Sequence, residues 1–162
     1  MKRDEVRAQV AIAVRACIDK KAQDISLLRL DAAASGFTDY FVICSGANPR
    51  QVEAIAEGVD EQLSKAGYEP SHVEGRTRAE WVLLDYVDFV VHIFSESARR
   101  FYDLERLWKT AARLELADLG KPAAKKAATG VKRASVKKTS AKPASKKRAR
   151  KLPVARRIRK GS

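Results

Sequence analysis

The spacing of apolar residues along the first part of the chain predicts three helices. Apolar positions three and four residues apart run through residues 4–22, with Asp4 as the expected N-cap. A second such stripe begins at Pro49, a residue suited to the first turn of a helix, and ends near Gly67, which favours a helix C-terminus. A third helix is predicted over residues 97–116.

Short apolar runs between these helices predict strands. Residues 25–30 form one, and residues 40–44 are almost continuously apolar, which indicates a strand buried on both faces. Two further runs, residues 81–86 and 89–94, are separated by only two residues and predict a tight hairpin. The polar segment 68–80 predicts a loop with a short edge strand.

The elements follow the order α-β-β-α-β-β-α. Strands and helices in such an order bury their apolar faces by packing as a sheet covered with helices. The sequence therefore predicts an α/β (α+β) fold, in which a mixed β-sheet is flanked by helices.

Charge divides the chain into two regions. The sequence carries 33 Lys and Arg against 20 Asp and Glu, a net charge of +13, but the first 119 residues hold all 20 acids and 16 of the bases. The remainder has 17 bases, no acid and none of the aromatic residues. Such a segment cannot bury enough apolar surface to offset the entropy of ordering it. We therefore predict a folded domain of residues 1–118 and a disordered basic tail of residues 119–162.

The composition argues against several other classes of protein. No apolar run approaches the roughly 18 residues that a membrane-spanning helix requires. Acids follow the N-terminal Lys2-Arg3 at once, which is unlike a targeting peptide. Cys17 and Cys44 form neither a disulfide framework nor a C-x-x-C pair for zinc. These features predict a cytoplasmic protein without membrane contact.

Candidate catalytic residues are few and poorly arranged. Ser45 follows a strand and precedes a helix, but the segment lacks the first glycine of the G-x-S-x-G nucleophile motif. His92, a candidate base, lies in an apolar run where a structural histidine is more common. Asp85 and Asp88 resemble a metal-binding carboxylate pair, although such sites usually need a third carboxylate. A turn capped by both acids is the favoured interpretation, and the sequence predicts no enzyme, no cofactor and no metal site.

Surface recognition has better support. The large aromatic residues Trp81, Tyr86, Tyr102 and Trp108 stand close to acids in the sequence, which suits docking onto a basic protein. Trp108 is expected instead to fill the seam between sheet and helix. The basic tail is expected to bind polyanions through charge, with steep salt dependence and little sequence preference.

Four segments of the domain resemble a known family. They are residues 39–46, 50–56, 81–94 and 100–108, which read DYFVICSG, RQVEAIA, WVLLDYVDFVVHIF and RFYDLERLW. In this order they resemble the ribosomal silencing factor family, RsfS, also called Iojap-like, and the likeness covers about residues 6–112. The resemblance implies a nucleotidyltransferase-like fold that has lost its chemistry. It also implies docking on the large ribosomal subunit, through the fourteenth large-subunit ribosomal protein, at the face where the small subunit joins, so that translation is silenced.

The resemblance implies roles for particular residues. Family members usually carry glycine where this chain has Val87, so a positive φ there would strain the valine. The expected interface with the ribosomal protein comprises Trp81, Asp85, Tyr86, Asp88, Tyr102 and Asp103. The tail is expected to lie on ribosomal RNA through Lys125, Lys126, Lys137, Lys138, Lys146, Lys147, Arg148, Arg150, Arg156 and Arg157.

Two alternatives from other functional classes stay open on the residues alone. One is a nucleotidyltransferase-like enzyme that uses Asp85 and Asp88, and the other is a nucleoid-type DNA binder driven by the tail. Exposed aromatic residues permit either a monomer or a weak homodimer.

Overall fold

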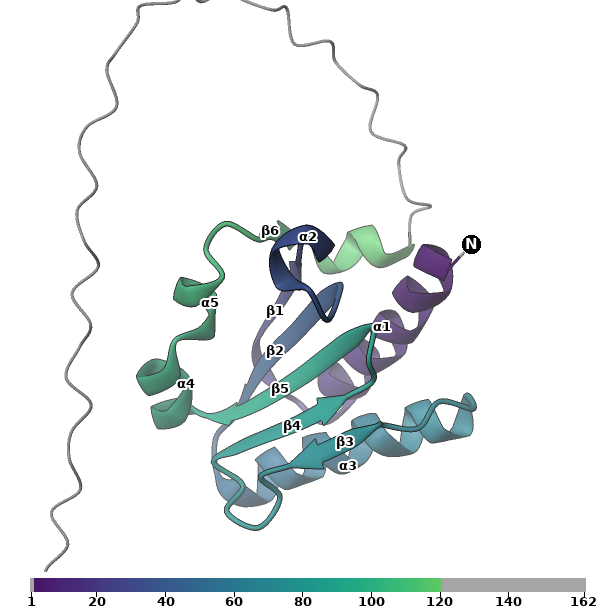
Figure 1. Ribbon diagram of the computed structural model, residues 1–162. Coiled ribbons are helices and arrows are strands. Elements are labelled where there is room, and N and C mark those ends of the chain that lie inside the picture. The colour runs from purple at the N-terminus through teal and green to yellow at the C-terminus, as the bar shows by residue number, and fades with distance from the viewer. Residues whose placement is uncertain (1, 121–162) are drawn as a thin grey trace, which may run out of the picture. The chain divides into compact units, whose positions relative to one another are not determined.

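The computed structural model describes residues 2–120. The predicted tail lies outside the described residues from Lys121 onward, together with its candidate RNA contacts, and its first two residues, Leu119 and Gly120, belong to a 3-10 helix. In chain order (Figure 1) the elements are α1 (Lys2–Asp19), β1 (Gln23–Arg29), α2 (Ala32–Ser35), β2 (Tyr40–Gly46), α3 (Pro49–Lys65), β3 (His72–Glu74), β4 (Trp81–Asp85), β5 (Phe89–Ser95), α4 (Glu96–Tyr102), α5 (Leu104–Leu107), β6 (Ala112–Leu114) and η1 (Leu116–Gly120).

Within residues 2–120 the strands form a six-stranded mixed sheet in the order β3-β4-β5-β2-β1-β6. The central strands β2 and β5 pair in parallel, and the other neighbours are antiparallel. Every residue of β2 is buried, which confirms the predicted strand with two covered faces. The β4–β5 hairpin and the short edge strand β3 are also confirmed, and with them the mixed α/β class.

Helices α1 and α3 cover one face of the sheet and lie behind it in Figure 1. The apolar stripe of each helix is buried as its spacing predicts. Val10, Ala13 and Cys17 of α1, like Ile55 and Val59 of α3, are fully enclosed. Sequence pattern decides this packing, because each helix has one apolar stripe and the sheet offers it one apolar face.

The helix boundaries differ from the prediction in detail. α1 begins at Lys2, so Asp4 lies in its first turn instead of capping it. α3 begins at Pro49 as predicted, and the side chain of the N-cap Asn48 accepts the Gln51 N–H at 2.9 Å. Gly67 follows the last turn of α3 with φ of 89°. In the described part of the chain, no helix is long and apolar enough to cross a membrane.

The opposite face of the sheet is covered only in part, by α4 and α5. Leu104 of α5 packs there with Leu28, Phe41 and Phe94 in a smaller apolar cluster. In Figure 1 no helix crosses β4 on the side toward the viewer. Leu83, in the middle of β4, is accordingly half-buried, although its neighbours in sequence are fully enclosed.

The predicted third helix over residues 97–116 is confirmed only in its first half, as the two short helices α4 and α5, and is wrong beyond Leu107. The chain turns at Asp103, whose left-handed φ of 43° ends α4, and the one-turn helix α5 follows. The next residues form β6, which pairs with β1 because the edge of β1 offers backbone groups that require partners. The break also allows Leu104 to enter the core, while Phe101, three residues before it, remains 81% exposed.

Cys17 of α1 and Cys44 of β2 are free and buried, with their sulfur atoms 3.9 Å apart. The hydrogen bond to the Cys17 thiol, together with burial, holds the pKa of Cys44 well above its usual value. Cys44 therefore stays a thiol at neutral pH, and the two side chains serve as small apolar groups where α1 meets the sheet.

The loop between β3 and β4 depends on a glycine that approaches the backbone of β4. Gly75 has φ of 84°, and a Cβ there would lie 1.8 Å from the Trp81 carbonyl oxygen. Gly67 has a nearly equal φ of 89°, but a Cβ there meets nothing within 4 Å. We expect Gly67→Ala to cost about 1 kcal/mol through its φ alone, and Gly75→Ala to cost about 3 kcal/mol or more through φ and clash together. Urea denaturation of the two variants measures the difference, and equal costs would contradict the close approach.

Candidate protein-docking surface

Trp81 is the centre of a group of aromatic side chains on the partly covered face. Its indole Nε1–H donates to His92 Nδ1 at 3.1 Å. Its ring stacks on Phe94 of β5, with centroids 5.0 Å apart, and contacts Tyr102 of α4 at 4.6 Å. Phe101 continues the series by contacting Tyr102 edge to face.

The ring contacts extend from Trp81 across the sheet in the other direction. His92 meets Phe41 of β2 edge to face at 4.7 Å, and Phe41 contacts both Trp108 and Phe37. Trp108 is half-buried against Phe41, as the sequence predicted for a residue in the sheet–helix seam. We call this continuous series, from Phe37 through Phe41, His92, Trp81 and Tyr102 to Phe101, the aromatic row.

His92 is a structural member of the aromatic row. Burial lowers its pKa to about 4, so the ring is neutral at pH 7. Because Nδ1 accepts the Trp81 N–H, the ring proton belongs on Nε2, which is buried without a partner in the described part of the chain. This histidine orients the Trp81 indole and lies too deep to act as a general base.

The outer members of the aromatic row and their neighbours expose a large apolar area. Phe101 is 81% exposed, Phe37 62% and Tyr102 45%, and Leu107 of α5 adds a further side chain that is 72% exposed. Single exposed apolar residues are common, but several on one side of a domain indicate a surface that binds another protein.

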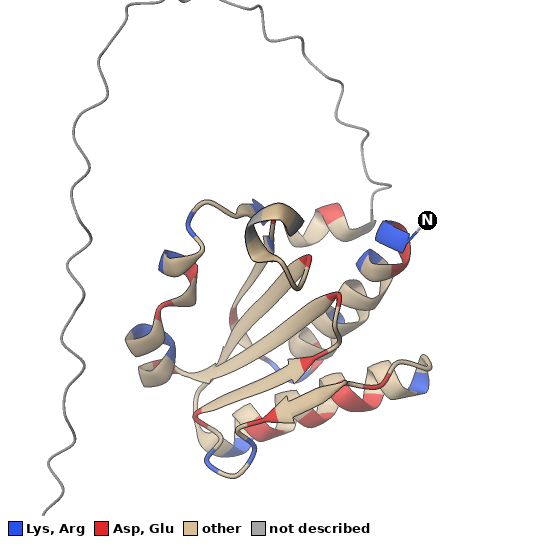
Figure 2. Cartoon of the chain, viewed as in Figure 1, with Lys and Arg blue, Asp and Glu red and all other residues tan. Residues whose placement is uncertain are grey.

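Charged groups lie beside this apolar area. On β4, Trp81 and Leu83 share one face with Asp85, because successive strand residues alternate between faces. Glu80, directly before Trp81, is exposed. Figure 2 shows acidic residues around β3 and β4, and along α3 on the other face of the sheet, whereas α4 and α5 carry basic residues as well.

The structure brings only some of the predicted interface residues together. Trp81 and Tyr102 are in contact, and Asp103 follows Tyr102 directly. Asp85 lies at the far end of β4, and its carboxylate accepts the Val87 N–H at 2.7 Å, so it caps the turn as expected. Asp88 does not share this role; it pairs with Lys2 at 3.3 Å.

Tyr86 lies away from the aromatic row. Its side chain is buried on the α3 side of the sheet, where its ring stacks on Phe89 at 4.9 Å. Burial, together with the nearby carboxylates of Asp60 and Glu69, raises the pKa of its hydroxyl. In this structure Tyr86 packs in the core and presents no surface to a partner.

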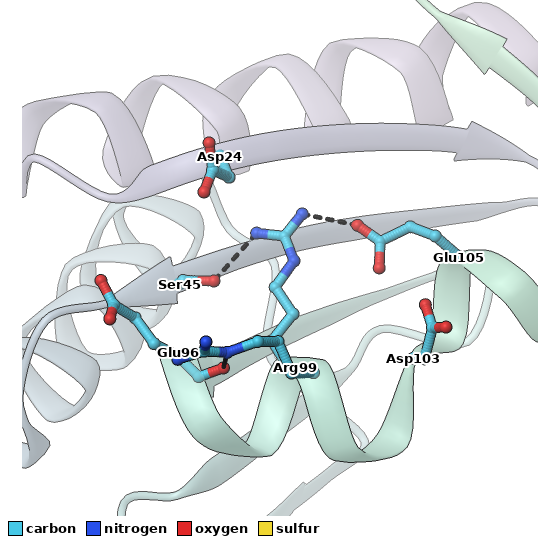
Figure 3. A pocket seen from close by; sticks show the side chains of 7 residues that line it. Asp24, Ser45, Glu96, Arg99, Asp103 and Glu105 are labelled. Atoms are coloured by element: carbon cyan, nitrogen blue, oxygen red, sulfur yellow. Dashed lines mark hydrogen bonds and ion pairs between the residues drawn. The ribbon is translucent and has the colours of Figure 1, made fainter.

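A partly buried arginine holds α4 and α5 against the sheet (Figure 3). The Arg99 guanidinium donates to Ser45 Oγ at 2.9 Å and to Glu105 Oε1 at 2.5 Å, and it also reaches Ser26 Oγ at 3.4 Å. It forms one wall of a cleft of about 550 Å³ whose lining includes Asp103. One side chain thus ties β1, β2 and α5 to α4, the helix that carries Tyr102.

Sequence pattern alone does not identify these supporting residues. Arg99 is the first of two adjacent arginines, and nothing in the pattern distinguishes it from the exposed Arg100. Phe101 lies at helical spacing from buried residues, so its exposure follows only from the break at Asp103. The contact between Trp81 and His92 depends on strand register, which a single sequence does not show.

The described residues offer little for catalysis. Ser45 is buried on β2 with its hydroxyl bonded to Arg99. Within residues 2–120 no group of three or more His, Cys, Asp or Glu side chains is arranged to hold a metal ion. Fold and surface together define a mixed α/β domain with a partly exposed aromatic surface.

Comparisons with known proteins agree on one family. The family model for "Ribosomal silencing factor during starvation", RsfS, matches residues 3–148, which extends beyond residue 112 into the basic segment. The chain is 44% identical to ribosomal silencing factor RsfS of Bacillus subtilis over 67% of this chain and 88% of that protein. It is also 33% identical to the chloroplastic protein Iojap of Zea mays, over 63% of this chain and 44% of that protein.

Solved structures show the same fold. A crystal structure of a Chromobacterium violaceum protein has a TM-score of 0.60 and 34% identity, covering 63% of this chain and 84% of that one. A crystal structure from Bacillus halodurans has a TM-score of 0.56 and 37% identity, covering 65% and 95%. The chain belongs to the RsfS family.

The Arg99–Glu105 ion pair helps to hold α4, the helix that carries Tyr102, and its contribution to stability can be tested. Burial alone would raise the pKa of Glu105, but the hydrogen bond and charge of Arg99 outweigh it and lower that pKa below its usual value. We expect Glu105→Gln to destabilise the protein by about 1–2 kcal/mol at pH 7, because Arg99 loses its counter-charge while mostly buried. Urea denaturation at several pH values measures the effect.

The stabilisation contributed by Glu105 should be lost at low pH and retained at neutral pH. A carboxylate with a lowered folded pKa stabilises the protein above its unfolded pKa, near 4.3, and loses that contribution as pH falls through the folded value. The difference between wild type and Glu105→Gln should therefore shrink below about pH 4. Glu61→Gln, which breaks the exposed pair with Lys65, is the control and should have a much smaller effect. Equal effects of the two variants would contradict a supporting role for Glu105.

Proposed function

We propose that this protein is a ribosomal silencing factor that acts by binding and not by catalysis. It docks on the large ribosomal subunit at the face where the small subunit joins, and its presence there blocks joining and represses translation. Membership of the RsfS family supports this proposal, as do relatives that carry the name ribosomal silencing factor. The observation that carries it is the exposed aromatic surface centred on Trp81 and Tyr102.

The aromatic row suits a particular kind of partner. Tyr102 and Trp81 offer large, rigid contact area backed by fixed neighbours, which is the usual character of binding hot spots. Glu80 directly before Trp81, and Asp85 at the far end of the same strand, favour a partner with basic groups around an apolar site. Proteins that bind ribosomal RNA are rich in such groups, and we take the partner to be the fourteenth large-subunit ribosomal protein, in the cytoplasm.

The enzymatic alternative has less support. A nucleotidyltransferase needs carboxylates free to hold a metal beside nucleotide phosphates. Here one oxygen of Asp85 is occupied in the turn, and Asp88 faces Lys2. We therefore assign both acids to the turn and its surroundings.

Replacement of Tyr102 tests the docking surface. We expect Tyr102→Ala to weaken co-sedimentation with isolated large subunits about tenfold or more, because it removes an exposed anchor that Trp81 holds in place. The same variant should fail to block association with small subunits. Ile18→Ala, which truncates an exposed residue of α1 on the opposite side of the sheet, is the matched control and should bind like wild type. Failure of the wild-type protein to bind or to block association would overturn the proposed function.

The basic segment beyond the described residues is proposed to contact ribosomal RNA next to the docking site. Each base that meets a phosphate releases counterions, so this contact should make binding depend steeply on salt. We expect deletion of residues 121–162 to weaken binding to large subunits and to flatten its salt dependence, while docking through the domain persists. Binding titrations at about 50 and 200 mM salt, where such effects are large, measure how steeply the affinity of the full-length and of the truncated protein depends on salt. Equal slopes would contradict the RNA contact, and loss of all binding would favour a tail-driven binder.

A further inference from the structure

The turn between β4 and β5 holds a valine in an unfavourable conformation. Val87 has φ of 70°, in the left-handed region. The Asp88 N–H donates to the Tyr86 carbonyl at 2.9 Å, which closes a three-residue turn around Val87. A three-residue turn with positive φ at its centre is rare and strained. The Asp85 carboxylate reinforces it by accepting the Val87 N–H.

This conformation disfavours the folded state. A branched residue at positive φ brings Cβ close to a backbone carbonyl, and the usual penalty corresponds to about a tenfold loss in the folding equilibrium. Glycine would adopt the same φ without that penalty. The backbone conformation of the turn is therefore unfavourable for the valine that occupies it.

Packing among residues 2–120 does little to offset the strain. The Val87 side chain is 59% exposed at the tip of the hairpin, so it buries little apolar surface against its own domain. Strain that the fold does not need tends to persist at sites that contact a ligand or a partner.

The turn lies at one end of the proposed docking surface. Trp81, Leu83 and Asp85 follow one another along the same face of β4, and Val87 comes directly after them. The strand rise places Asp85 about 13 Å from Trp81. A typical interface covers about 800 Å² on each partner, which is wide enough to include both. Asp85 and Asp88 put a carboxylate on each side of Val87 in the sequence.

We infer that Val87 is an additional contact residue for the ribosomal protein, where its isopropyl group fills an apolar site bordered by basic groups. The inference rests on the proposed function and deepens it by adding a second anchor, at the hairpin tip, to the aromatic row. The strained turn presents the side chain outward, and the Asp85 carboxylate, which holds the turn through one oxygen, directs its other oxygen to a basic group of the partner.

Three substitutions separate the side chain from the backbone. Val87→Gly removes both the backbone strain and the apolar isopropyl group. Val87→Asn also tolerates positive φ, and it keeps a side chain of similar size but makes it polar. Val87→Ala keeps a Cβ, and thus much of the strain, while it removes both methyl groups.

The experiment measures melting temperature and co-sedimentation with large subunits for each full-length variant. We expect Val87→Gly and Val87→Asn to melt higher than wild type by about 4 °C and Val87→Ala to melt near wild type. All three should bind about fivefold more weakly, because each loses the apolar contact.

The outcomes distinguish failure of the Val87 contact from failure of the proposed function. Wild-type affinity in the three variants would overturn the role of Val87 and leave the proposed function intact. Weak binding by Val87→Gly alone would also overturn it, since turn rigidity and not the apolar side chain would then matter. Absence of binding by the wild-type protein would overturn the proposed function and this inference with it.

Discussion

Burial of the central parallel pair β2 and β5 is the constraint on which the rest of the domain depends. Parallel strands at the centre of a sheet need apolar cover on both faces, because each carries side chains to either side. Every residue of β2 is buried, and β5 is buried through Phe94. The remaining elements are arranged to supply that cover, and they do so unequally.

The two faces differ in how completely they are covered. On one, α1 and α3 are long enough to enclose the strands with regular apolar stripes. On the other, α4 and α5 are short, and the partly buried guanidinium of Arg99 joins them to the strands. Aromatic rings fill the space that helices leave open, and the outermost of them reach solvent. Incomplete cover is thus the physical origin of the surface to which we assign docking.

The same arrangement explains why the domain suits recognition. Polar groups near the aromatic row already have hydrogen-bond partners within the domain. His92 Nδ1 accepts the indole N–H of Trp81, and Ser45 Oγ accepts an N–H of the Arg99 guanidinium. Asp85 caps the hairpin turn. Groups that are committed in this way orient aromatic side chains rigidly, and rigid aromatic side chains bind a partner at a low entropic cost.

The sequence by itself determined α1, α3, the buried strand β2 and the β4–β5 hairpin, because their apolar spacing repeats with the period of each element. It also indicated Trp81 and Tyr102, which lie together. It did not show the break at Asp103 or the strand β6, since these satisfy the open edge of β1 and the need of Leu104 for burial. Nor did it separate Tyr86, which turns into the core, from Trp81, which faces outward in part. Only the tertiary structure decided these positions, because strand register and unequal helix cover arise from contacts between residues far apart in the chain.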